Sequence, residues 1–409
     1  MKEGQMVLNI PKSHAVAILS PFALYSGHHF NYTRELAGRL VAAGTPVQIH
    51  ITCGADTLRA EVPDARVFSV CPWLRHVHRW LKLDTRRDGL AFKIIQNFET
   101  LACALSLWWH RRGVSAVYWQ DARHQIMLFF IRMLREQTHV NLVLGPIPFG
   151  GLKFMKLRIR NLYKKALSSN RLTFVAETVA IVEQWKKLAG HHVVHIPVAL
   201  GKPHAYPTSI TRKNLGIAKT DFVCLLFGTH RGDKDYLTVV RAAKAARSRP
   251  FLLFAGPLIS TNDPKSILDD ENYTHGLSII RRMEEEEASA YFALSDCAIL
   301  PYAKNYEKGS AVLLQACKYN IPVITSRSGH LQRFVEEFQT GMCYEPGDSN
   351  DLANRIDAMA AHNHQNPTYW DRNLAEVRRK FSWEVILPKY LKLFKFSNEQ
   401  LRNTHNFTK

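Results

Sequence analysis

Two loops in the second half of the chain contain residue types that bind anions. The first has the sequence GTHRGDK, residues 228–234, directly after the apolar run 222–227. Arginine offers a planar pair of N–H donors to phosphate oxygens, and lysine adds a compact positive charge. In open α/β sheets, ligands bind at loops that follow the carboxyl ends of strands. A basic surface loop is the alternative, but the position after a buried strand favours Arg231 and Lys234 as ligands of a phosphate group.

The second loop lies within residues 294–347, which read as strand, polar loop, helix and strand. Glu307 precedes Gly309 and Ser310, and an apolar helical pattern follows. The first N–H groups of a helix lack partners within it, and its dipole makes that end positive. We therefore predict that the backbone of Gly309, Ser310 and Ala311 binds the anion. Glu307 could also simply complement the helix dipole, and both roles can hold together.

Short apolar runs alternate with helical patterns along the chain, which is typical of parallel strands joined by crossover helices. A first series starts at 14–20 and a second at 222–227. The two series predict an α/β fold of two Rossmann-like, doubly wound domains facing each other across a cleft. Residues 200–220, rich in Gly, Pro, Lys and Ser/Thr, are predicted to link them. The strands of the first half are predicted at 14–20, 46–52, 67–70, 114–119, 140–144, 172–176 and 192–198.

The chain is strongly basic. It has 409 residues, with 54 Lys and Arg against 35 Asp and Glu, and a formal charge of +19. Such an excess implies an anionic partner, because it costs self-repulsion. Nucleic acid, anionic lipid and anionic small substrates all fit. No RNA-binding signature or zinc-finger spacing occurs, so nucleic acid is not expected as a partner.

The seven cysteines are scattered and include no CxxC pair, which favours reduced thiols and a cytoplasmic location. The N-terminal residues 1–13 have an acid at position 3 and no apolar core, so they are not expected to be a signal peptide. The apolar runs fall short of the ~20 residues that span a bilayer. The polar ends, 1–13 and 398–409, are predicted to be loose.

The most basic segment, residues 151–171, carries seven Lys and Arg and no acid. Its apolar residues fall at helical spacing, so it is predicted to be a basic amphipathic helix. Such a helix can lie on an anionic membrane surface, or it can be an ordinary surface helix with solvated lysines. With the Trp-, Arg- and His-containing stretch 72–80, it suggests an acceptor that is anionic or lipid-linked at the inner membrane face.

The motif FGTHRGDKDYLTVVRAA, residues 227–243, resembles the first strand, loop and helix of the nucleotide-binding domain in family-4 (group 1) glycosyltransferases of GT-B fold. That family also carries two Glu residues separated by seven intervening positions. Glu307 matches the first, and Gln315 stands where the second is usual. Further matching markers are Pro322-Val323-Ile324, Gly341, Pro346-Gly347-Asp348, Leu352 and Phe381-Ser382-Trp383-Glu384.

The resemblance implies a retaining glycosyltransferase that moves a hexosyl unit from a nucleoside-diphosphate sugar to a glycan acceptor. Arg231 and Lys234 would bind the donor diphosphate, and Glu307 would contact the sugar and stabilise an oxocarbenium-like transition state. The helix start would receive the charge that grows on the leaving group. Gln315 can accept one hydrogen bond from the ribose but lacks the charge of Glu. No metal or other cofactor is implied.

The first half of the chain matches the family less closely. The family opens with a glycine-rich loop near the donor phosphate, whereas loop 21–29 has only Gly27, with His28 at the usual second glycine. His28 could donate to a phosphate, contact the acceptor, or have no role. Asp121 and His124 are catalytic candidates, because family members often carry a His after the equivalent of strand 114–119. Asp121 could instead cap the next helix.

Glu177 follows strand 172–176 and could line the cleft. Several histidine pairs resemble metal ligands, but none has a Cys or acid at ligand spacing, so no metal site is predicted. The histidines are His76/His78, His191/His192/His195 and His362/His364.

The resemblance divides the chain into an acceptor-binding domain (1–199), a donor-binding domain (200–380) and a C-terminal helix with a loose tail (381–409). The helix is expected to cross back to the first domain. The expected partners are a nucleotide-sugar donor, a saccharide or lipid-linked acceptor and an anionic membrane surface. Two alternatives remain: a sugar-nucleotide epimerase of the same fold, and a catalytically silent membrane-associated scaffold, which Gln315 and His28 motivate.

Overall fold

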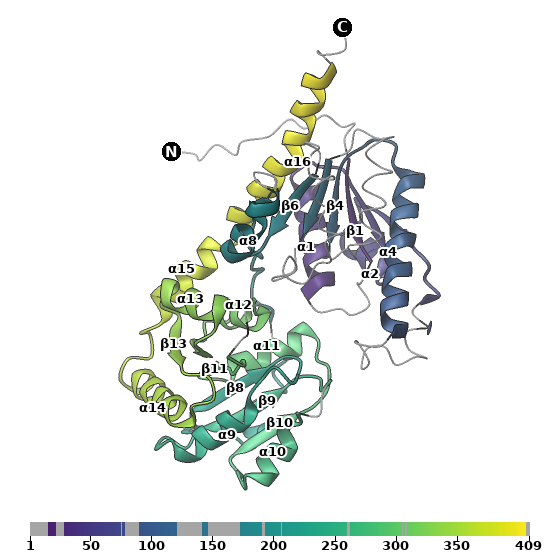
Figure 1. Cartoon of the computed structure of the whole chain (residues 1–409). Helices are drawn as coiled ribbons and strands as arrows, with labels where there is room; N and C mark the ends of the chain where they lie inside the picture. Colours follow the sequence, from purple (N-terminus) through teal and green to yellow (C-terminus); the bar gives the residue numbers. More distant parts are fainter. Residues whose placement is uncertain are drawn as a thin grey trace. The chain divides into compact units, whose positions relative to one another are not determined.

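The computed structural model describes residues 15–21, 28–74, 76–77, 90–120, 141–145, 172–189, 193–205, 207–259, 262–304, 306 and 309–405. The chain divides into two compact units (Figure 1). Unit 1 contains residues 1–198 and 384–409, and unit 2 contains residues 199–383. The domain boundaries expected from the sequence, 199/200 and 380/381, lie within a few residues of this division.

Unit 1 is built on a parallel sheet with the strand order β3-β2-β1-β4-β5-β6-β7 across its described part. The order reverses between β1 and β4, and such switch points are where α/β sheets bind ligands. The strands are β1 (Ala15–Ser20), β2 (Val47–Ile51), β3 (Arg66–Ser69), β4 (Val114–Gln120), β5 (Asn141–Gly145), β6 (Leu172–Ala176) and β7 (Val193–His195). The helices are α1 (His28–Ala42), α2 (Ala55–Glu61), α4 (Leu90–His110) and α8 (Val179–Ala189).

Unit 2 repeats this architecture with the order β10-β9-β8-β11-β12-β13, again parallel, and its switch point lies between β8 and β11. The strands are β8 (Val223–Phe227), β9 (Phe251–Ala255), β10 (Gly276–Ile279), β11 (Cys297–Leu300), β12 (Val323–Ser326) and β13 (Gly341–Tyr344). The helices are α9 (Tyr236–Ala245), α10 (Pro264–Asp270), α11 (Glu285–Ala293), α12 (Ala311–Lys318), α13 (Gly329–Phe338), α14 (Ser349–Gln365) and α15 (Asp371–Lys380), with a short 3-10 turn at Lys213–Leu215.

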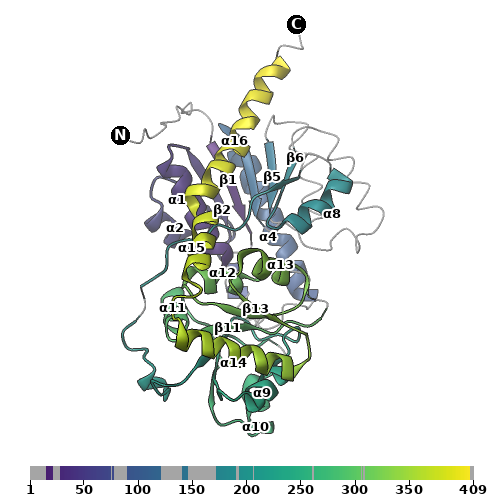
Figure 2. The same ribbon diagram turned by 90° about the vertical axis from the view of Figure 1, so that its left-hand side faces the viewer.

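The apolar composition of the central strands explains these sheets. Strand β8 has the sequence VCLLF, and its first four side chains are buried. Such runs are excluded from water on both faces only when helices cover the sheet. Figure 2 shows α9 and α14 close together, and the two helices pack against each other in unit 2. The expectation of two Rossmann-like α/β domains is confirmed.

The C-terminal helix α16 (Trp383–His405) is assigned to unit 1 from residue 384 onward. Its Tyr390 hydroxyl lies 2.8 Å from that of Tyr32 and 3.4 Å from that of Tyr118. The helix extends to His405, and the expectation of a loose tail from residue 398 stays a prediction. No Pro or Gly, the residues that break helices most strongly, occurs after Pro388.

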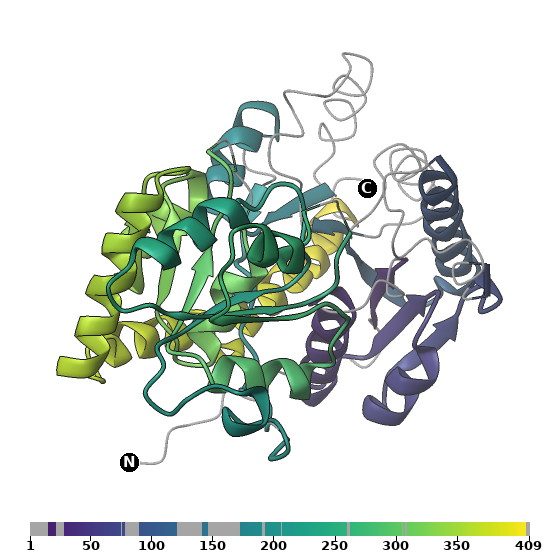
Figure 3. The same ribbon diagram turned by 90° about the horizontal axis from the view of Figure 1, so that it is seen from below.

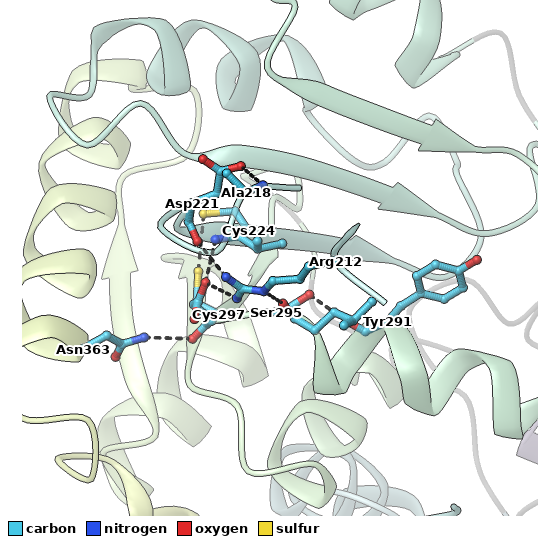
Figure 4. A network of polar contacts seen from close by, with 11 residues as sticks. Arg212, Ala218, Asp221, Cys224, Tyr291, Ser295, Cys297 and Asn363 are labelled. Atoms are coloured by element: carbon cyan, nitrogen blue, oxygen red, sulfur yellow. Dashed lines mark hydrogen bonds and ion pairs between the residues drawn. The ribbon is translucent and has the colours of Figure 1, made fainter. Parts of the chain in front are cut away.

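The predicted linker 200–220 is also wrong, because this segment packs into unit 2. Arg212 donates to the carbonyls of Leu294 and Asp221, both at 2.9 Å, and to Asp296 Oδ2 at 2.8 Å. Figure 4 shows this guanidinium beside the Cys224–Cys297 pair, which stands on the neighbouring strands β8 and β11. A single arginine with several backbone acceptors overrides the flexible composition of the segment.

Smaller differences concern the ends of elements. Strand β7 covers only 193–195 rather than 192–198, because Pro197 has no N–H to donate. The predicted helix 126–134, the basic helix 151–171 and the N-terminal residues 1–13 lie outside the described residues.

Asp296 is the acceptor that joins this segment to the sheet, because its Oδ2 also accepts from the Val223 N–H at 2.7 Å. We expect Asp296→Ala to lower the free energy of unfolding of unit 2 by about 1–3 kcal/mol, since a strand N–H and a guanidinium lose their partner. Urea denaturation followed by fluorescence measures this. The matched control is Glu271→Ala, which removes an exposed pair with Arg241 and should cost about 0–1 kcal/mol. Equal losses would contradict the role of Asp296.

Candidate functional site

The loop after β8 is held firmly against the loop after β9. The Gly228 N–H donates to the Ala255 carbonyl at 2.9 Å, and the His230 N–H donates to the Pro257 carbonyl at 2.8 Å. His230 is buried, its Nδ1 lies 2.6 Å from the Tyr236 hydroxyl, and burial together with Lys234 lowers its pKa to about 3. Its ring is therefore neutral and structural, and it fixes the loop that carries the cations.

Lys234 places an ammonium group at the carboxyl end of β8. Its side chain is nearly buried, and Nζ donates to the Phe227 carbonyl at 2.9 Å. Burial, and then the positive charge of Arg231, lower its pKa to about 7. A nearby anion would strongly stabilise the charged form of such a lysine and raise its pKa.

Arg231 lies beside Lys234, with its side chain about one third exposed, and Nη2 is 3.1 Å from Asp233 Oδ2. The amide of Asn262 donates to the carbonyls of Arg231 at 3.3 Å and Lys234 at 2.6 Å, which fixes the backbone between the two cations. The Arg231 guanidinium also interacts with Tyr302 and Tyr306 of the second loop. Both predicted phosphate ligands are therefore held in one cluster.

The second loop follows β11 and is hydrogen-bonded to the first. The Asp235 N–H donates to the Pro301 carbonyl at 2.7 Å, and the Ala303 N–H donates to the Asp233 carbonyl at 3.0 Å. Lys234 and Tyr302 form an antiparallel bridge between these contacts. The described residues of the two loops at the switch point of unit 2 are thus joined by backbone hydrogen bonds.

Two stacked tyrosines position the start of α12. The rings of Tyr302 and Tyr306 lie 3.9 Å apart. The Tyr302 hydroxyl is 3.0 Å from Ser310 Oγ, and the Tyr306 hydroxyl donates to the Gly309 carbonyl at 3.0 Å. Because Ser310 bonds Tyr302, its side chain does not cap the helix, and the first N–H groups of α12 keep their binding capacity. Gly309 and Ala311 are exposed at this end.

Sequence reasoning missed His330 in α13. A Cβ atom built on Gly309 would lie 3.9 Å from His330 Cδ2, so this imidazole stands beside the start of α12. The only signal in the sequence was a histidine shortly after β12, the strand next to β11. The half-buried His330 is a further candidate for contact with the anion.

The predicted residues divide into three groups. Arg231, Lys234, Gly309, Ser310 and Ala311 are brought together at one end of unit 2, as described above. Gln315 lies one turn beyond Ala311 on the same face of α12 and is half-buried, so it is near the same site. Glu307, Gly27, Asp121 and His124 lie outside the described residues.

In unit 1, the placement of His28 in a loop is wrong, because it is the first residue of α1. The chain can enter a helix there, since no Gly or Pro follows Gly27 until Gly38. Glu177 follows β6 and is half-buried, and its carbonyl lies 3.2 Å from His195 Nε2.

The switch point of unit 1 contains a contact that the sequence did not predict. Thr33 of α1 donates to Gln120 Oε1 at 2.5 Å and also lies 3.1 Å from Ser20 Oγ. All three side chains are buried. The ends of β1 and β4 are therefore tied together by the helix that follows β1.

No cluster of three or more His, Cys, Asp or Glu suited to a metal ion occurs among the residues that the structure describes. The expectation that donor binding needs no metal stays a prediction.

Comparisons with known proteins identify a related family and similar folds. Residues 208–376 match the family "Glycosyl transferases group 1". A comparison with curated protein sequences found no match. Among solved structures, sucrose-phosphate synthase from Thermosynechococcus elongatus is similar with a TM-score of 0.71 and 18% identity, covering 96% of this chain and 100% of that one.

Two further solved structures are similar over nearly the whole chain. A glycosyltransferase from Rickettsia africae has a TM-score of 0.67 at 17% identity, with 94% and 98% of the two chains covered. Anabaena HepE, solved in complex with UDP-glucose, has a TM-score of 0.63 at 13% identity, with 96% and 99% covered. The fold is GT-B, unit 2 carries a glycosyltransferase domain, and the chain is a transferase enzyme. The family-4 assignment stays a prediction.

Proposed function

We propose that the protein is a retaining hexosyltransferase that takes its sugar from a nucleoside-diphosphate donor and transfers it to a glycan acceptor. The observation that carries the proposal is the convergence of Arg231, Lys234 and the uncapped start of α12 at the switch point of unit 2. Two cations and free helix N–H groups suit a diphosphate, which carries charge on several oxygens. The retaining outcome is supported by the resemblance of the motifs around Arg231 and Glu307.

The site would act mainly on the leaving group. Transfer breaks the bond between the anomeric carbon and a phosphate oxygen, and the electron pair stays on the diphosphate. Arg231, Lys234 and the first N–H groups of α12 then bind a growing negative charge, which lowers the barrier because the interaction is stronger in the transition state. Glu307 is proposed to contact the sugar as its ring becomes positive. The new glycosidic bond forms to an acceptor hydroxyl, whose proton is lost.

UDP is the first nucleotide to test, because the similar Anabaena HepE was solved with UDP and with UDP-glucose. We propose a lipid-linked glycan acceptor at the inner membrane face, supported by the charge of +19. An epimerase of the same fold would use the same diphosphate site but would form no bond to an acceptor.

Nucleotide binding and transfer test the proposal together. At saturating UDP, GDP or ADP, one nucleotide should raise the unfolding temperature, and Arg231→Ala should remove this shift. Glu307→Gln should keep the shift but lower transfer from a labelled UDP-sugar by about 10²–10³-fold. Arg241→Ala, an exposed arginine on α9, is the control and should change neither.

Each contrary result excludes a different part of the proposal. No thermal shift with any nucleotide would exclude the donor site. Unchanged transfer in Glu307→Gln would exclude the role of that carboxylate. Binding without transfer or hydrolysis would favour the silent scaffold, and epimerised donor without a glycoside product would favour the epimerase.

A further inference from the structure

The inner face of helix α4 of unit 1 contains polar residues in its first half and Cys103, Ala104 and Leu107 in its second half. Gln96, Glu99 and Thr100 are buried, and Glu99 and Thr100 have no exposed surface. The Thr52 hydroxyl of unit 1 donates to Glu99 Oε1 at 3.4 Å, so this polar stripe faces the protein. A surface helix normally keeps its polar residues in water and has few apolar residues on its outer face.

The outer face of α4 is apolar at each exposed position that the structure describes between 94 and 110. Ile94 is 58% exposed, Phe98 42%, Leu105 49% and Trp109 78%. Their spacing of four, seven and four residues places them along one side of the helix. In Figures 1 and 3, α4 lies at the edge of unit 1, and the strands of the sheet lie on the inner side of the helix.

Trp73 extends this surface. It precedes α4 in the chain, is 54% exposed, and its ring centroid lies 6.0 Å from that of Phe98. We call the five residues Trp73, Ile94, Phe98, Leu105 and Trp109 the α4 apolar face. They are half of the large exposed apolar side chains found in the described residues. A group of large exposed apolar side chains on one side of a helix marks an interaction site.

The charged residues next to the α4 apolar face indicate which kind of partner binds there. The only acid of α4, Glu99, is buried, and Arg111 and Arg112 follow directly after the helix. Arg111 also covers the Trp108 ring at 4.6 Å. Tryptophan with apolar side chains, bordered by cations and lacking exposed acids, suits the interface of an anionic bilayer.

We propose that unit 1 binds an anionic membrane through the α4 apolar face, with the helix lying in the plane of the interface. No helix of the described part of the chain is both long and apolar enough to cross a bilayer. The apolar side chains would enter the acyl boundary while Arg111 and Arg112 contact phosphate headgroups. The proposal deepens the proposed function, since it rests on an acceptor at the membrane and names the surface that reaches it.

Flotation of the full-length protein tests this surface. The probe is vesicles of phosphatidylcholine mixed with phosphatidylglycerol, compared with phosphatidylcholine alone. Wild type should bind the mixed vesicles more strongly, and the double variant Phe98→Ser/Trp109→Ser should lose at least about tenfold in partition coefficient. Tyr369→Ser is the matched control, because Tyr369 is 48% exposed but lies in unit 2, and it should bind like wild type.

A second measurement shows whether the double variant is folded. It also tests the membrane surface independently of the donor site. The thermal shift with nucleotide should be the same in the double variant and in wild type. Brominated lipid should quench the tryptophan fluorescence of wild type, and Trp73→Phe/Trp109→Phe should bind but show less quenching. Undiminished vesicle binding by the folded Ser variant would overturn the proposal. The proposal would also be overturned if wild type is a dimer that binds no vesicles and the Ser variant is a monomer. That result would make the α4 apolar face a protein interface.

Discussion

Lys234→Met should lower the rate of glycosyl transfer by about 10²–10³-fold, which is the usual loss when one preorganised donor to a developing negative charge is removed. Methionine fills a similar volume, so the loop should keep its contacts through Asn262 and Tyr302. The lost group is the ammonium at the end of β8, 2.9 Å from the Phe227 carbonyl. Steady-state kinetics with the donor identified by thermal shift would measure the effect.

The same substitution should stabilise unit 2, raising its unfolding temperature by about 2–4 °C near pH 7. The pKa of Lys234 is about 7 in the folded protein, well below its ordinary value, so burial of the charged form opposes folding. The free-energy cost of burying the charged lysine is fully present below pH 7. Above pH 7 the unfolded state binds more protons than the folded state, and stability rises with pH until the ordinary lysine pKa is passed. Methionine should remove this rise.

Donor binding should depend on pH through the same group. A bound diphosphate raises the pKa of Lys234, so binding takes up a proton above pH 7, and nucleotide affinity should fall by up to about tenfold per pH unit there. Calorimetric titration at pH 6 to 9 measures it. Lys244→Met, at an exposed lysine of α9, should keep the wild-type profile. An unchanged profile in Lys234→Met would contradict the assignment.

Gly256→Ala should strongly destabilise unit 2 and remove nucleotide binding. Gly256 follows β9 with φ of +147°, and a Cβ there would lie 2.3 Å from the Gly228 carbonyl oxygen. Real Cβ atoms do not approach a backbone oxygen so closely, so the loop that carries Arg231 and Lys234 must move. We expect a loss of about 3 kcal/mol or more in the free energy of unfolding, and no thermal shift with nucleotide.

Gly216→Ala is the matched control for this collision. Gly216 also has a positive φ, +71°, but a Cβ there meets nothing within 4 Å. Its substitution should therefore cost only the backbone strain, about 1–2 kcal/mol, and should leave nucleotide binding intact. Urea denaturation and thermal shift of both variants would measure the difference. If the two alanines have equal effects, the close approach of Gly256 to Gly228 does not matter.

The sequence by itself determined the fold class and the two cations of the site. Buried strands such as β8 are continuous apolar runs, and this signal depends only on neighbouring residues. The loop GTHRGDK follows such a run, so Arg231 and Lys234 could be placed at the end of a strand without a structure. Composition gave a wrong prediction where a single side chain determines the structure. Residues 200–220 have the composition of a linker, but Arg212 joins them to Asp296.

The tertiary structure alone decided how the site is assembled. The order β10-β9-β8-β11-β12-β13 makes β8 and β11 neighbours, although 69 residues separate Phe227 from Cys297 in the chain. Only this pairing brings Lys234 to Tyr302, so that the two loops of the site meet. Burial likewise lowers the pKa of Lys234, and the apolar outer face of α4 can be recognised only once the buried side of the helix is known. These properties depend on contacts between distant residues, which local patterns do not encode.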